Sequence, residues 1–316
     1  MTRPLILDVD GTFLKNDLTH EMVWEAVRRD PARALQYLSL GLRDKPAMKQ
    51  AMVARIGDRL LQDPQPLEPA IVALAKQAKA DGRSVYLCSG SEDSLVQRLA
   101  ARHDFIDGAF GTSPTYNMTS ANKAAFLRDR FPDGFDYAGN STQDFAVWEA
   151  AQEGFGIRPP PGTDLTETAA GLPVDILIER SSPMDALPLL LRGLELWKLL
   201  VVLLPILLAT VFIGLSSRDT LILALSLATL FLARNVGRML KNVPEDRTRK
   251  RAGLDNPVAT GTLSVPFAAA AYVGLAAAGL GLLASVSIWP ALLLISIRVL
   301  VSLFKRVSPS DAKARS

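Results

Sequence analysis

Residues 256–297 carry no charged side chain, and this uncharged run constrains the fold of the C-terminal third. One membrane-spanning helix needs about 20 mainly apolar residues, so the run is long enough for two spans. A break near Ser285–Pro290 divides it, and apolar segments at Leu199–Leu215 and Leu221–Ala233 bring the expected number of spans to about four. The alternative, a buried helical core in a soluble protein, is disfavoured because uncharged runs this long are hard to place otherwise. We therefore expect an all-α transmembrane bundle over residues 196–316.

The basic residues beside these segments predict how the chain is oriented. Loop 241–255 and the C-terminal tail are rich in Lys and Arg, whereas the connections near 216–220 and 285–290 carry no net positive charge. The positive-inside rule places both termini and the basic loop in the cytoplasm, so we expect an integral protein of the cell inner membrane with a cytoplasmic soluble domain. We interpret the basic loop as a topology signal that faces anionic membrane lipids. With a net charge of only +3, no nucleic-acid partner is expected.

The first 180 residues alternate short apolar runs with segments of helical periodicity. Runs rich in branched residues lie at 4–9, 84–90, 134–141 and 174–179, and apolar residues recur at helical spacing between 17 and 80. This alternation predicts a parallel α/β sheet, in which ligands bind at the carboxyl ends of the strands.

The first predicted strand runs into the motif Asp8-Val9-Asp10-Gly11-Thr12. Two carboxylates two residues apart on a loop can face one site, where one attacks an electrophile while the other shuttles a proton. Phosphate is a suitable target because a carboxylate nucleophile forms an aspartyl phosphate on it. The meeting of two anions requires countercharge, which Mg²⁺ and Lys123 can supply. By itself the motif is also compatible with an ordinary acidic turn.

Four motifs in order resemble the haloacid dehalogenase (HAD) superfamily of phosphohydrolases over roughly residues 4–180. They read DVDGT (8–12), LCSGS (87–91), ANKAAF (121–126) and GNSTQD (139–144). The resemblance implies a Rossmann-like α/β domain over 1–180, with a helical cap at about 17–80 that closes over the site. It also implies these roles: nucleophile for Asp8, general acid/base for Asp10, hydrogen bonding to the phosphoryl group for Ser89, charge balance for Lys123, and Mg²⁺ binding by Asp8, Asp10, Asn140 and Asp144.

Several other residues in or near these motifs are expected to have structural roles or to modify metal binding. Asn140 stands where many HAD members carry Asp, and its uncharged amide predicts weaker Mg²⁺ binding. Ser91 is expected to cap the helix that follows it, and Cys88 to be a packed strand residue. His20 is expected at a helix cap or on the surface, and His103 at a helix end; two histidines make a multi-histidine metal site implausible.

After a linker at 181–195, the membrane half resembles the UbiA-type prenyltransferase family over about 190–310. The similarity rests on LRGLELWKLLVVLLPILLA (191–209) and on the basic loop ending NPVATGTLS (256–264). The family carries an Asp-rich motif, of which the comparable stretch RNVGRMLKNVPEDR (234–247) keeps only Asn235 and Asp246. In addition, Asn256 stands where the family usually has an Arg. The family has about nine spans, so the resemblance implies a partial domain that a second membrane chain is able to complete.

Three functions are compatible with this sequence. The first is a membrane-bound, Mg²⁺-dependent HAD-type phosphatase acting on a phosphorylated isoprenoid or lipid-linked small molecule. The second is a UbiA-type prenyl or phosphoribosyl transferase with an accessory HAD domain, which the missing carboxylates disfavour. The third is a catalytically inactive membrane module, which the retained Asp8, Asp10, Lys123 and Asp144 disfavour.

Overall fold

A computed structural model of the chain describes residues 3–180, 182–192, 194, 204, 216–248 and 256–286. The chain divides into two compact units. The first comprises Met1–Leu189 together with Lys241–Pro266, and the second comprises Leu190–Leu240 together with Phe267–Ser316. The expected division into a soluble part followed by a membrane part differs from these units in one respect, because the described residues 241–248 and 256–266 belong to the first unit.

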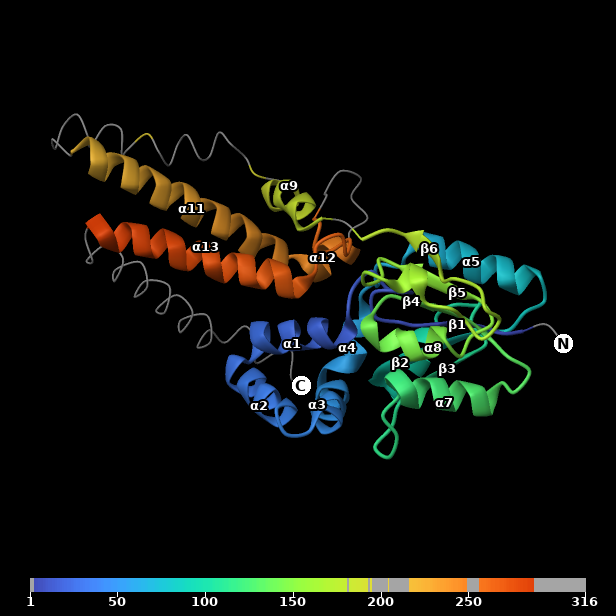
Figure 1. The fold of residues 1–316 in the computed structure, drawn as a ribbon. Coiled ribbons are helices and arrows are strands. Elements are labelled where there is room, and N and C mark those ends of the chain that lie inside the picture. The colour runs from blue at the N-terminus through green and yellow to red at the C-terminus, as the bar shows by residue number, and fades with distance from the viewer. Residues whose placement is uncertain are drawn as a thin grey trace. The chain divides into compact units, whose positions relative to one another are not determined.

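The first unit is built on a parallel six-stranded sheet with the order β3-β2-β1-β4-β5-β6 (Figure 1). This confirms the predicted α/β class. The sequence patterns missed β3 and β5, whose glycine-rich segments GAFGT and GFGI lack the usual strand composition. The strands are β1 (Leu5–Leu7), β2 (Val85–Glu92), β3 (Gly108–Thr112), β4 (Asp136–Gly139), β5 (Gly154–Ile157) and β6 (Asp175–Ile178).

Helices cover both faces of this sheet, as the alternation of side chains along β1 shows. Leu5 and Leu7 point into a core that includes apolar residues of α5 (Pro69–Ala80) and α6 (Asp93–Ala100). Ile6 points to the other face and joins a second core with α7 (Ser120–Arg130) and α8 (Phe145–Trp148). Since successive strand residues face opposite sides, an apolar run such as LIL is suited to a strand that is buried on both faces.

The helical insert between β1 and β2 begins with α1 (Leu18–Arg29), α2 (Pro31–Gly41) and α3 (Lys45–Met52). Each of these helices follows an aspartate whose side chain accepts a hydrogen bond from the N–H three residues on. Such N-caps satisfy amides that have no partner within the helix. A π-helical turn, Val53–Gly57, leads into α4 (Asp58–Gln62). The predicted cap at 17–80 is therefore mainly helical, with a non-helical segment at 63–68, and its last helix, α5, contributes to the core on one face of the sheet.

The remaining elements of the first unit are short. They include α12 (Val243–Thr248) and the 3₁₀ turns Thr142–Asp144, Thr163–Leu165 and Pro183–Asp185. Helix α9 (Ala186–Leu191) begins in the first unit and ends in the second.

Two helices, α11 (Ser217–Lys241) and α13 (Val265–Val286), are long and apolar enough to cross a membrane. They correspond to the second and third predicted spans. In the second unit, the Ser226 hydroxyl donates to the Gly279 carbonyl oxygen (2.8 Å), and a Cβ at Gly279 would collide with Leu230. Small residues of this kind let two helix backbones approach closely.

The third span begins later than its uncharged run suggests. Residues 256–264 form turns before α13 starts, and Oδ1 of Asn256 accepts hydrogen bonds from the amides of Val258 and Ala259. The first predicted span and the segment after Val286 lie outside the described residues. The expectation of about four spans thus stays a prediction.

Candidate functional site

Three neighbouring strands bring the predicted site residues to one edge of the sheet. Asp8 directly follows β1, Ser89 lies in β2, and Asn140 directly follows β4. Because β1 pairs with both β2 and β4 in parallel, the carboxyl ends of all three strands meet there. A cavity of about 730 Å³ opens at this edge. All six predicted site residues line it: Asp8, Asp10, Ser89, Lys123, Asn140 and Asp144.

Lys123, on α7, forms a buried ion pair with Asp8. Its Nζ donates a hydrogen bond to Oδ1 of Asp8 (2.7 Å) and lies 3.5 Å from Oδ1 of Asp144. Burial raises the pKa of Asp8 to about 7; Lys123 opposes this shift, and the neighbouring Asp144 and Asp10 add to it. Burial lowers the pKa of Lys123, but the two carboxylates outweigh it and raise that pKa above its ordinary value. The pair therefore holds a permanent positive charge beside a carboxylate that readily changes its charge near neutral pH.

Asp144 is held by protein donors on both of its carboxylate oxygens. The Tyr137 hydroxyl donates to Oδ1 (2.5 Å), while the amides of Asn140 and Ser141 and the Ser141 hydroxyl donate to Oδ2 at 2.9–3.0 Å. Tyr137 also accepts a hydrogen bond from Lys123 (2.9 Å), so its hydroxyl connects the ammonium to Asp144. Burial and the two carboxylates of Asp144 and Asp8 raise the pKa of Tyr137 well above its usual value, which keeps the hydroxyl neutral.

Asp10 is also held through both oxygens. Its Oδ1 accepts a hydrogen bond from the amide of Leu18 (2.8 Å), and its Oδ2 accepts from the hydroxyls of Ser89 (3.2 Å) and Ser91 (2.7 Å). The Ser89 hydroxyl is therefore engaged with Asp10 in this structure, and the roles that the resemblance implies for these residues stay predictions.

Ser91 and Tyr137 were missed as members of the site. The expected helix cap at Ser91 is wrong, because Glu92 caps α6 by accepting a hydrogen bond from the Leu95 amide (3.0 Å). Ser91 still belongs to β2, so it points to the same side as Ser89, two residues earlier. The alternation in Ser89-Gly90-Ser91 is the sequence signal that predicts this placement.

The oxygens left for a divalent cation are few. Oδ2 of Asp8 accepts no hydrogen bond from a described residue, whereas the carboxylates of Asp10 and Asp144 are engaged. Among the described residues, no three His, Cys, Asp or Glu side chains are arranged to hold a metal ion. The Asn140 side chain lies against Gly11, whose φ of +80° and lack of a Cβ permit the contact. This donor set fits Mg²⁺ held by Asp8 and Asn140 with water and substrate oxygens, since Mg²⁺ commonly uses only one or two protein carboxylates.

The insert contributes a second group of side chains to the cavity. Asp17, His20 and Lys49 line it, and Nζ of Lys49 donates to the carbonyl oxygen of Gly90 (2.7 Å). The Nδ1 atom of His20 lies 3.5 Å from Oδ2 of Asp17. The His20 side chain is 54% exposed, as expected for a surface residue, and it also lines the cavity. Burial, and after it the nearby negative charge of Asp10, raises the pKa of Asp17 above its ordinary value.

Cys88 and His103 lie where the sequence predicts, in a strand and after a helix. Cys88 is fully buried in β2, and burial raises the pKa of its thiol to about 12, so it remains protonated and packed. His103 follows α6 and makes an edge contact with Phe13, with ring centroids 5.2 Å apart.

Comparisons with known proteins give similarities over parts of the chain. No family model matches it. An uncharacterized protein of Sinorhizobium fredii, y4nM, is 34% identical over 150 residues, which are 47% of this chain and 28% of that protein. The chain thus spans less than a third of this curated relative.

Solved structures are similar over about half of the chain. A Bordetella pertussis protein of unknown function aligns with a TM-score of 0.45 and 17% identity, over 55% of this chain and 99% of its own. A HAD family hydrolase from Salmonella enterica serovar Typhi gives 0.40 and 19%, over 55% and 67%. A phosphoserine phosphatase in apo form gives 0.40 and 17%, over 59% and 98%.

Proposed function

We propose that the first unit is a HAD-type phosphatase that hydrolyses phosphate monoesters through an aspartyl phosphate on Asp8. The observation that carries this proposal is the buried contact of Asp8 with Lys123 inside a cavity at the carboxyl ends of β1, β2 and β4. An ammonium group in this position stabilises the negative charge of a phosphoryl group that approaches a carboxylate. In this proposal, the nucleophile and its countercharge act on the same phosphoryl group.

The chain's own residues have defined parts in this reaction. The carboxylate of Asp8 attacks phosphorus, the ester P–O bond breaks, and Asp10, having first taken up a proton, donates it to the leaving alcohol. Water then attacks the phosphoryl group and passes a proton to Asp10, while the bond between phosphorus and the Asp8 oxygen breaks and releases inorganic phosphate and the free Asp8 carboxylate. Ser89 and Ser91 hold Asp10 through hydrogen bonds, and Tyr137 holds Lys123.

A magnesium ion would be held by Asp8 and Asn140. When bound, it would neutralise charge on the phosphate oxygens as a Lewis acid.

We further propose that the substrate carries a hydrocarbon chain, as a phosphorylated isoprenoid or lipid-linked molecule does. Leu38 and Leu42 line the cavity, yet they are 44% and 90% exposed. Apolar side chains at the mouth of a polar cavity are suited to an amphiphilic molecule whose phosphate enters and whose chain stays outside. The presence of α11 and α13, which are long and apolar enough to cross a membrane, supports an enzyme anchored at a membrane. The cytoplasmic side proposed for the first unit follows from the positive-inside rule.

The transferase alternative has less support. In the first unit, Nδ2 of Asn256 donates to Oδ2 of Asp246 (2.8 Å), and Arg247 is paired with Glu21. The retained acid of the degenerate motif is thus engaged within the unit that contains the phosphate site.

The deciding experiment uses the purified full-length chain in detergent, with and without Mg²⁺. We expect release of inorganic phosphate from p-nitrophenyl phosphate, and a higher kcat/KM for a polyprenyl monophosphate. Leu38→Ser and Leu42→Ser should lower kcat/KM for the polyprenyl substrate only. Leu35→Ser is the matched control, because Leu35 is exposed on α2 but does not line the cavity. Absence of phosphate release from every substrate, with Mg²⁺ present, contradicts the proposal.

A further inference from the structure

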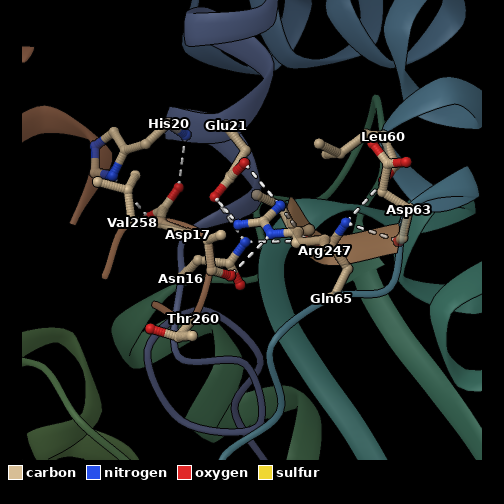
Figure 2. Close-up of polar contacts among 12 residues, drawn as sticks. Asn16, Asp17, His20, Glu21, Leu60, Asp63, Gln65, Arg247, Val258 and Thr260 are labelled. Carbon is tan, nitrogen blue, oxygen red and sulfur yellow. Dashed lines mark hydrogen bonds and ion pairs between the residues drawn. The ribbon is translucent and has the colours of Figure 1, made fainter. Parts of the chain in front are cut away.

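A buried ion pair connects the helix that follows α11 to the insert beside the phosphate site. Arg247 of α12 and Glu21 of α1, both in the first unit, are 226 residues apart, and their side chains are only 4% and 5% exposed. The guanidinium donates to both carboxylate oxygens of Glu21, at 2.7 and 3.1 Å (Figure 2). This geometry contradicts the interpretation of Arg247 as a basic topology signal, because the charge is enclosed in protein.

The guanidinium is satisfied on every side. Its Nε donates to the carbonyl oxygen of Ala259 (3.1 Å), and one terminal nitrogen lies 3.5 Å from Oε1 of Gln65. Two-pronged contact with a carboxylate is specific to arginine, whose donors form a planar fork. Removing one partner of a buried pair leaves the other charge uncompensated, which is strongly destabilising.

Glu21 connects this pair to the catalytic loop. Its Oε1 also accepts a hydrogen bond from Nδ2 of Asn16 (2.9 Å), and the carbonyl oxygen of Asn16 accepts from the amide of Gly11 (3.1 Å). Glu21 lies in the first turn of α1, the same turn whose Leu18 amide donates to Oδ1 of Asp10 (2.8 Å). Arg247 therefore anchors the residues that fix Gly11 and Asp10, without touching the cavity where phosphate binds.

We infer that Arg247 is a positioning residue for Asp10: the connection between the two candidate membrane helices completes the phosphatase site through the Arg247–Glu21 pair. This inference rests on the proposed function for its catalytic consequence. In the chain order, the described residues of this connection, 242–248 and 256–264, lie between α11 and α13. Because this connection follows α11 in the sequence, a site that depends on it can form only after α11 has been synthesised.

The test uses the full-length protein with Arg247→Met, Arg247→Lys and, as the matched control, Lys241→Met, which removes an exposed positive charge from the end of α11. We expect Arg247→Met to speed hydrogen exchange in residues 16–22 while β4 keeps its protection. We also expect kcat to fall about 10- to 100-fold with little change in KM, as for a misplaced catalytic group. Arg247→Lys should lie between, and Lys241→Met should match the wild type.

A double variant separates positioning from folding. Glu21→Met with Arg247→Met removes both buried charges, a replacement that is often neutral or stabilising. We expect its Tm to return towards the wild-type value while kcat stays low. Recovery of kcat together with Tm overturns the inference, as does unchanged exchange of residues 16–22 in Arg247→Met. If the wild type releases no phosphate, the proposed function fails by itself, and the exchange measurement still decides whether Arg247 holds this segment.

Discussion

Nζ of Lys123 donates a hydrogen bond to Oδ1 of Asp8 across 2.7 Å, although the two residues are 115 positions apart. Both side chains are almost fully buried, at 5% and 10% exposure. The buried ammonium and carboxylate lie at the wall of an open cavity. In the proposed function, a phosphoryl group that enters the cavity replaces solvent beside them.

Asp8→Asn is expected to abolish phosphate release by the full-length protein, because an amide oxygen does not form a stable phosphoryl ester. The measurement is release of inorganic phosphate from p-nitrophenyl phosphate, together with a search by mass spectrometry for a phosphorylated peptide containing residue 8. Asp133→Asn, at an exposed position outside the cavity, is the control and should be fully active. Equal activity of Asp8→Asn and the wild type removes Asp8 from its role.

Tyr137→Phe is expected to weaken both folding and activity. The substitution leaves Oδ1 of Asp144 and Nζ of Lys123 each short of a buried partner, which costs about 1–3 kcal/mol of unfolding free energy. With Lys123 less firmly held, kcat should fall by about tenfold, as when a supporting hydrogen bond is lost. Tyr86→Phe, the same change on β2, is the control. Unchanged Tm and kcat in Tyr137→Phe would show that the hydroxyl does not support Lys123.

Asn140→Asp is expected to lower the Mg²⁺ concentration that gives half-maximal phosphate release. The added charge strengthens attraction for a divalent cation, whereas the amide of Asn140 offers only a neutral oxygen. Asn117→Asp adds a negative charge elsewhere on the same cavity and should leave the requirement nearly unchanged. If the two variants respond alike, the effect is one of general charge, and Asn140 is not a ligand.

Stability should fall with rising pH because of Asp8. Its pKa is raised from 3.8 to about 7 on folding, so between these values the folded protein binds a proton that the unfolded chain has lost. The stability that this bound proton gives to the folded state is fully present below pH 3.8 and is lost as the pH rises through about 7. Each unit of difference between the folded and unfolded pKa corresponds to about 1.4 kcal/mol of unfolding free energy. Measured from pH 4 to 8, the Tm of Asp8→Asn should therefore gain on that of the wild type. A constant difference in Tm contradicts the raised pKa.

Three of the four motifs of the site were recognisable from the sequence because they lie at the ends of predicted strands. Apolar runs at 4–9, 84–90 and 134–141 predicted strands β1, β2 and β4, and the carboxyl ends of parallel strands meet at one edge. The Asp8–Lys123 contact was anticipated from the need for countercharge beside Asp8 and from the order of motifs in a resembling family. Tyr137 was missed because a tyrosine inside a strand gives no local sign that its hydroxyl reaches two charged groups.

The pattern of apolar and charged residues by itself determined the α/β class, the helical insert and the two candidate membrane helices that the structure describes, because each depends on local periodicity. Only the tertiary structure decided that Arg247 is a buried partner of Glu21 and that Ser91 holds Asp10. A basic residue reads the same in a sequence whether water, lipid or a carboxylate surrounds it. Which of these it meets depends on distant segments that come together only when the chain has folded.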